Sequence, residues 1–180
     1  MNCRSLTGII EAGKYPQIWN EADLSDLSGE LSIDTQGFES CTSVNTVRLP
    51  STKVGFAGAF SGCTSLSTIY IDGSKKQDGV FDLTGISKLW VGWGHNFKNT
   101  AVVTVKLPRG VDIPEYCFYN CSNLERIEFE RIQINPVGIG SYAFYYVNSE
   151  CEAYMDKMLE YNSSFQLKRN ATTDIPKIAY

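Results

Sequence analysis

The stretch that decides the fold reads Phe118-Tyr119-Asn120-Cys121-Ser122-Asn123-Leu124-Glu125-Arg126-Ile127-Glu128-Phe129. Apolar residues or Cys recur in it at steps of three, three, three and two. A helix buries a stripe with a period of about 3.6 residues and a strand alternates with a period of about 2, so neither alone explains the steps of three. The spacing predicts a turning segment that enters a short strand, whose last two apolar residues point to the same side.

The same spacing recurs along the chain, clearly from Phe38 and Phe60 and in a degenerate form elsewhere. The strand positions of the copies are Ile9, Leu31, Val47, Ile69, Leu89, Val105 and Ile127, at intervals of 16 to 22 residues. This period is typical of leucine-rich repeats. One coil cannot bury its own apolar edge, so the copies are expected to stack. We therefore predict a repeat solenoid with one parallel β-sheet of short consecutive strands, and irregular or 3-10 turns on its other side.

Several elements of the repeat resemble the BspA-like leucine-rich repeats of bacterial surface antigens. They are Ala59-Phe60, Gly62-Cys63 and Leu66-Ser-Thr-Ile69, then Asn120-Cys121 with Leu124-Glu-Arg-Ile127, and Ala143-Phe144. The resemblance covers about residues 1 to 161. It implies a location at the cell surface or in the secreted fraction, and adhesion to a host protein or another bacterial protein.

The last residues allow two interpretations. We expect the repeat array to cover 1–148, and 149–180 to form a C-terminal capping helix with a tail, because Ser149-x-x-Glu152 is a capping box. However, Ile175-Pro176 also resembles Ile113-Pro114, which opens a repeat, so the tail can instead lead into a further unit of a longer array. Both interpretations stay open at this point.

Composition excludes several classes of function. The chain has 180 residues, a net charge of -4 and 43% hydrophobic residues, which suits a folded domain and lacks the basic footprint of a nucleic-acid binder. No run of about eighteen apolar residues is present to span a membrane. The N-terminal residues show no targeting signal. We expect a monomer.

No set of residues points to catalysis, a metal ion or a cofactor. Four of the six cysteines share one repeat position, so we expect buried thiols, although a Cys41–Cys63 disulfide is sterically open. Cys117 is expected to fill the Ala place of the repeat, and the single histidine, His95, to lie in an exposed loop. We therefore predict a protein that is not an enzyme.

The exposed face of the predicted sheet is the remaining candidate site. Outward positions of the central strands bring aromatic and basic residues together, which are the types that dominate interface hot spots. The predicted ligand-binding residues are Tyr70, Trp90, Trp93, Arg48, Lys88 and Lys106. A protein or a glycan would suit such a face, and the aromatic residues can equally be ordinary strand residues. The predicted function is a binding or adhesion module, with a structural spacer in a larger surface protein as the alternative.

Overall fold

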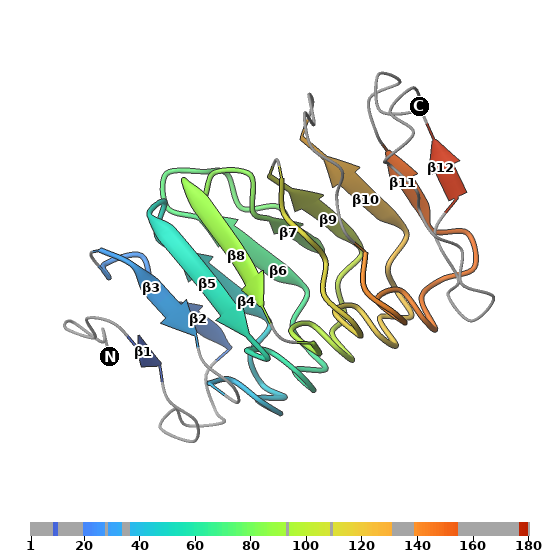
Figure 1. Cartoon of the computed structure of the whole chain (residues 1–180). Helices are drawn as coiled ribbons and strands as arrows, with labels where there is room; N and C mark the ends of the chain where they lie inside the picture. Colours follow the sequence, from blue (N-terminus) through green and yellow to red (C-terminus); the bar gives the residue numbers. More distant parts are fainter. Residues whose placement is uncertain are drawn as a thin grey trace.

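The chain is a solenoid of parallel strands stacked coil upon coil, with the strands Ile9–Ile10 and Lys177–Ala179 at opposite ends (Figure 1). The structure is a computed structural model and describes residues 9–10, 20–27, 29–33, 37–92, 94–108, 110–130, 139–154 and 177–179. The predicted repeat solenoid is thereby confirmed.

The strands form two sheets, so the prediction of a single sheet is wrong. Sheet A contains, in spatial order, β1 (Ile9–Ile10), β3 (Leu31–Ile33), β5 (Lys53–Ala57) and β8 (Lys88–Gly92). Sheet B contains β12 (Lys177–Ala179), β11 (Glu152–Tyr154), β10 (Arg126–Phe129), β9 (Thr104–Leu107), β7 (Val80–Asp82), β6 (Thr68–Ile71), β4 (Thr46–Leu49) and β2 (Glu21–Asp23). Each described ladder pairs its strands in parallel.

Two sheets form because one coil can supply a strand to each of them. After β4 the chain turns at Pro50, which has no N–H to continue a ladder, and Lys53–Ala57 then alternates with Val54 and Phe56 facing inward. The predicted strands near residues 9, 31 and 89 lie in sheet A, whereas those near 47, 69, 105 and 127 lie in sheet B.

A column of phenylalanine rings runs through the core between the sheets. Neighbouring rings have centroids 5.2 to 5.9 Å apart and nearly parallel planes. The column consists of Phe38, Phe60, Phe97, Phe118 and Phe144, one from each turn. Offset stacking of this kind adds to the gain from burial alone.

The repeated cysteines lie beside this column. Cys41, Cys63 and Cys121 are buried free thiols, as predicted. The thiol of Cys63 donates to the Phe38 carbonyl at 2.8 Å, and that of Cys121 donates to the Phe97 carbonyl at 3.0 Å. These two thiols thus donate to backbone carbonyls of the neighbouring coils.

Two irregularities depart from a simple repeat. Between β6 and β7 the exposed segment 72–78 replaces a sheet A strand, and Gly79 N then donates to Thr68 Oγ1 at 3.2 Å.

The predicted capping helix is wrong at its start, because Glu152–Tyr154 forms β11 against β10. Residues 155–176 of the predicted helix and tail lie outside the described residues, and the described ranges contain no helix.

Candidate binding surface

The structure separates the residues of the predicted binding face. Arg48, Tyr70 and Lys106 lie on the outer side of sheet B, while Trp90 belongs to β8 of sheet A. The predicted contiguous pair of Tyr70 and Trp90 is therefore wrong, because it assumed a single sheet. Trp93 lies outside the described residues. The backbone of Lys88 belongs to β8, and its side chain lies outside the described part of the structure.

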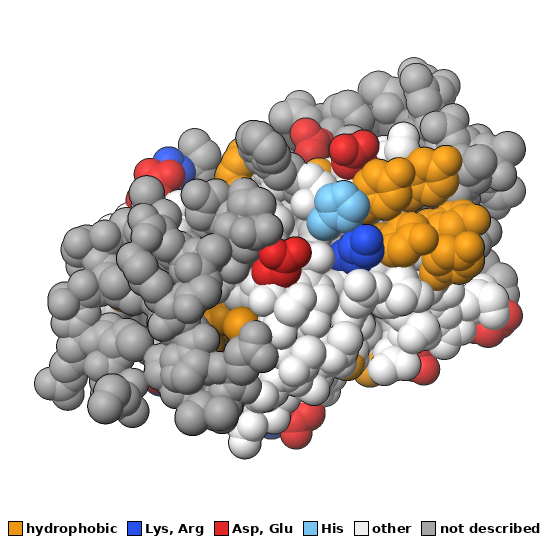
Figure 2. All heavy atoms as spheres, turned by 90° about the horizontal axis from the view of Figure 1, so that it is seen from below, with side chains coloured by type: hydrophobic (Ala, Val, Ile, Leu, Met, Phe, Trp, Pro, Cys, Tyr) orange, Lys and Arg blue, Asp and Glu red, His pale blue; other side chains and the backbone are white. Residues whose placement is uncertain are grey.

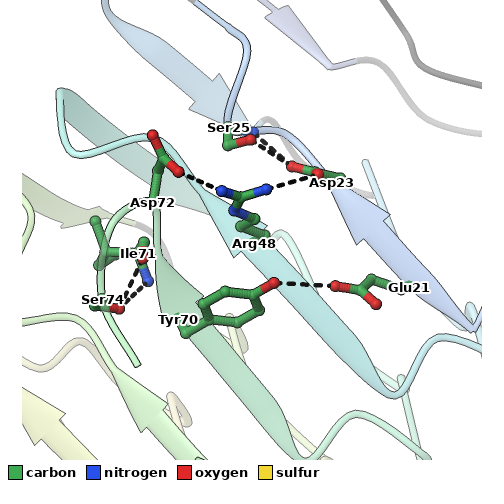
Figure 3. A network of polar contacts seen from close by, with 8 residues as sticks. All are labelled: Glu21, Asp23, Ser25, Arg48, Tyr70, Ile71, Asp72 and Ser74. Carbon is green, nitrogen blue, oxygen red and sulfur yellow. Dashed lines mark hydrogen bonds and ion pairs between the residues drawn. The ribbon is translucent and has the colours of Figure 1, made fainter. Parts of the chain in front are cut away.

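On sheet B, Arg48 is held between two carboxylates (Figure 3). Its Nη1 donates to Asp23 Oδ2 at 3.2 Å and its Nη2 donates to Asp72 Oδ1. Burial alone would raise the pKa of Asp23, but hydrogen bonds from Ser25 and the charge of Arg48 bring that pKa below its ordinary value. The charge of Arg48 is thus largely compensated within this face.

The other predicted groups of this sheet are also engaged. The hydroxyl of Tyr70 donates to Glu21 Oε1 at 3.1 Å, and partial burial together with this carboxylate raises the pKa of Tyr70. Lys106 Nζ lies 3.8 Å from Asp82 Oδ2 and donates to Gln77 Oε1 at 3.3 Å. Exposed pairs of this kind contribute little stability. Because of these pairs, few uncompensated charges on these residues are available to a partner.

On sheet A, the indole of Trp90 is half exposed and occupies space that two glycines leave open. A Cβ on Gly92, two residues further along β8, would lie 1.9 Å from Trp90 Cζ2. A Cβ on Gly55, which pairs with Trp90 in the ladder, would lie 3.3 Å from Cε3. Trp90 therefore packs against the two glycines of its sheet.

A second aromatic surface, which the sequence analysis missed, lies on the turns that precede β9, β10 and β11. We call it the tyrosine face, and it consists of His95, Lys98, Tyr116, Tyr119, Tyr142, Tyr145 and Tyr146. Figure 2 shows it as a block of hydrophobic side chains with a pale-blue imidazole and a basic side chain at its border. It is the largest gathering of hydrophobic side chains in that view.

The rings of the tyrosine face form two ladders from turn to turn. Tyr116 stacks on His95 with centroids 4.8 Å apart and on Tyr142 with centroids 5.2 Å apart. In the second ladder Tyr119 stacks on Tyr145 at 5.8 Å, and Lys98 Nζ lies 5.1 Å from the centroid of Tyr119. Each of these rings is thus held in its orientation by its neighbours.

The backbone beneath these rings is unusual. In the turns of Phe60, Phe97, Phe118 and Phe144, the residues two before and two after the phenylalanine are left-handed. The turn of Phe60 uses Gly58 and Gly62 at these places, with φ of 73° and 77°. The later turns use tyrosine at three such places: Tyr116, Tyr142 and Tyr146, with φ of 54°, 57° and 60°. A left-handed residue with a side chain costs about 1–2 kcal/mol relative to the usual conformation. Such strain concentrates at functional positions.

A signal for this surface was present in the sequence. Tyr116 and Tyr119 flank Phe118 at the same offsets at which Tyr142 and Tyr145 flank Phe144. The exposed loop position predicted for His95 is confirmed, but its stacking partner comes from the next turn. Cys117 occupies the place of Ala59 and Ala143, as predicted, because its carbonyl accepts from Phe97 N as theirs accept from Phe38 N and Phe118 N.

The described ranges contain neither a metal-binding cluster nor a membrane-spanning helix. Their His, Cys, Asp and Glu side chains form no group of three or more that could hold a metal ion. Among the same residues, no helix is long and apolar enough to cross a membrane.

Comparison with protein families identifies the repeat. The family model for the BspA type leucine rich repeat region matches six copies, over residues 24–89 and 94–175. Because these ranges cover most of the chain, the protein belongs to the BspA-type leucine-rich repeat family. Comparisons with curated proteins and with solved structures give no significant match.

Proposed function

We propose that this member of the BspA-type leucine-rich repeat family is a non-enzymatic module that binds another protein through its tyrosine face. The family supports a repeat-based interaction or surface module. We further propose that the protein works at the bacterial cell surface or in the secreted fraction and serves in adhesion. The observation that carries the proposal is the set of tyrosines at left-handed backbone positions.

The reasoning is energetic. Glycine serves at the equivalent places of an earlier turn without strain, so tyrosine at three of them is retained against a conformational cost. Stacking between the rings offsets part of that cost. Stacking between the rings does not require that any of them be exposed to solvent. Tyr146 is nevertheless 55% exposed. Rigid tyrosines cover a large contact area at small entropic cost, which suits a protein partner.

A structural spacer is the second candidate. The compensated charges on the outer side of sheet B favour it, because such a face offers a partner few groups that are not already engaged. A spacer would tolerate loss of the exposed tyrosine rings without any change in binding.

The test is a screen of the purified chain against arrays of secreted and cell-surface proteins and of glycans. A triple variant, Tyr116→Gly, Tyr142→Gly and Tyr146→Gly, removes three rings while giving each position the residue its backbone favours. Trp90→Ala on sheet A is the matched aromatic control. We expect a protein partner whose affinity falls at least about tenfold in the triple variant and is unchanged in the control.

Three outcomes would contradict the proposal. A partner that binds the wild type and the triple variant equally would place the binding site elsewhere. Ligands found only on the glycan array would make the partner class wrong. Binding to neither array would favour the spacer.

A further inference from the structure

We infer that the partner presents an arginine side chain to Tyr119, Tyr145 and Tyr146, which we call the three-ring corner. This inference rests on the proposed function and names the chemistry of the group that the tyrosine face recognises.

The three rings meet at different angles. Tyr119 and Tyr145 are stacked with an interplanar angle of 26°. The ring of Tyr146 stands at 82° to Tyr119 and at 59° to Tyr145, with centroids 5.6 and 4.1 Å away. Tyr146 is also one of the two most exposed large hydrophobic residues among those the structure describes. Because Tyr146 stands at steep angles to its two neighbours, no parallel ring of theirs covers it, and its exposed ring offers a negative π face to a cation from solvent.

This chain already uses tyrosine faces to hold cations. Lys98 Nζ lies over the ring of Tyr119 at 5.1 Å, on the tyrosine face itself. At another site, the guanidinium carbon of Arg126 lies 3.5 Å from the centroid of the Tyr154 ring. A guanidinium can stack flat on a ring and an ammonium cannot, since the guanidinium is planar and more weakly hydrated. Arginine is therefore the better match for an exposed tyrosine.

Charge favours the same choice. The chain carries a net charge of -4, so its field attracts a basic segment at long range. The short-range preference between arginine and lysine then comes from the rings, because both side chains carry the same charge. The two contributions can be separated experimentally.

The experiment measures fluorescence anisotropy with two labelled peptides that differ only in carrying three arginines or three lysines between Gly-Ser spacers. Titrations at about 0.15 M salt screen the long-range attraction. We expect the wild type to bind the arginine peptide about fivefold tighter than the lysine peptide, as an added cation–π contact would give. Tyr146→Gly keeps the net charge and should abolish this preference, while Trp90→Ala should retain it. Circular dichroism and melting temperature confirm that both variants are folded.

Equal binding of the two peptides by the wild type would overturn the inference, as would an arginine preference that survives in Tyr146→Gly. These failures are distinct from failure of the proposed function. If the triple glycine variant loses its protein partner while the peptides are not distinguished, the tyrosine face is correct and the arginine is not. If the peptides are distinguished but the arrays yield no partner, the proposed function loses its support.

Discussion

Truncation of Phe97 should destabilise the protein more than any other single change in the phenylalanine column. Its ring is 1% exposed and packs against four other rings, with centroid distances of 5.4 Å to Phe56, 5.9 Å to Phe60, 5.4 Å to Phe81 and 5.3 Å to Phe118. Phe97→Ala removes the ring from the middle of the stack, where neighbouring coils cannot close the cavity. We expect a loss of about 3–5 kcal/mol in the free energy of unfolding.

This loss is large beside the total stability of a domain, which is typically about 5–15 kcal/mol. Because each coil is stabilised by its contacts with the neighbouring coils, amide hydrogen exchange should accelerate in the flanking turns as well as at residue 97. Urea unfolding followed by circular dichroism gives the free energy, and Phe97→Leu, which keeps most of the volume, is the control. A cost below about 1 kcal/mol for Phe97→Ala would refute the idea that the ring column carries the stack.

Three further predictions concern the thiols and Trp90. Burial raises the pKa of Cys63 and of Cys151 to about 12, so an unfolded chain loses these protons at lower pH than the folded one does. Stability should be full below about pH 8.5 and fall above it by about 1.4 kcal/mol per thiol per pH unit, and urea titrations of Cys63→Ala should show a smaller slope. Adding reductant should leave the melting temperature of the wild type unchanged, since the described cysteines are free; a clear fall would reveal a disulfide. Gly92→Ala should displace the Trp90 indole and shift its fluorescence emission, whereas an unchanged spectrum would show that the ring does not depend on the glycine.

Much of the fold could be predicted from local spacing. Steps of three and two between apolar residues located Phe60, Cys63, Leu66 and Ile69 in one coil, and all four are buried. The spacing worked because each of these side chains points into the coil from a place fixed by the few residues around it. The same spacing could not tell a sheet A strand from a sheet B strand, because both present two inward apolar residues two apart, as Leu31 and Ile33 do in β3 and Val47 and Leu49 do in β4.

The candidate site depended on contacts between coils. Sequence alone identified Tyr70 and Trp90 as outward-facing strand residues, and this is correct for each residue taken separately. Their assignment to different sheets is decided by ladder pairing between β4, β6 and β7 on one side and β5 and β8 on the other.

The amino-acid sequence by itself determined the repeat, the buried cysteines and the family, because these follow from residue types at fixed short separations. Only the tertiary structure decided which exposed aromatic residues share a surface. His95, Tyr116 and Tyr142 stack although they are 21 and 26 residues apart in the chain, because successive turns are laid over one another. Such a contact arises from the stacking of whole coils. The local sequence pattern of one coil does not determine which residues of the next coil its side chains will contact.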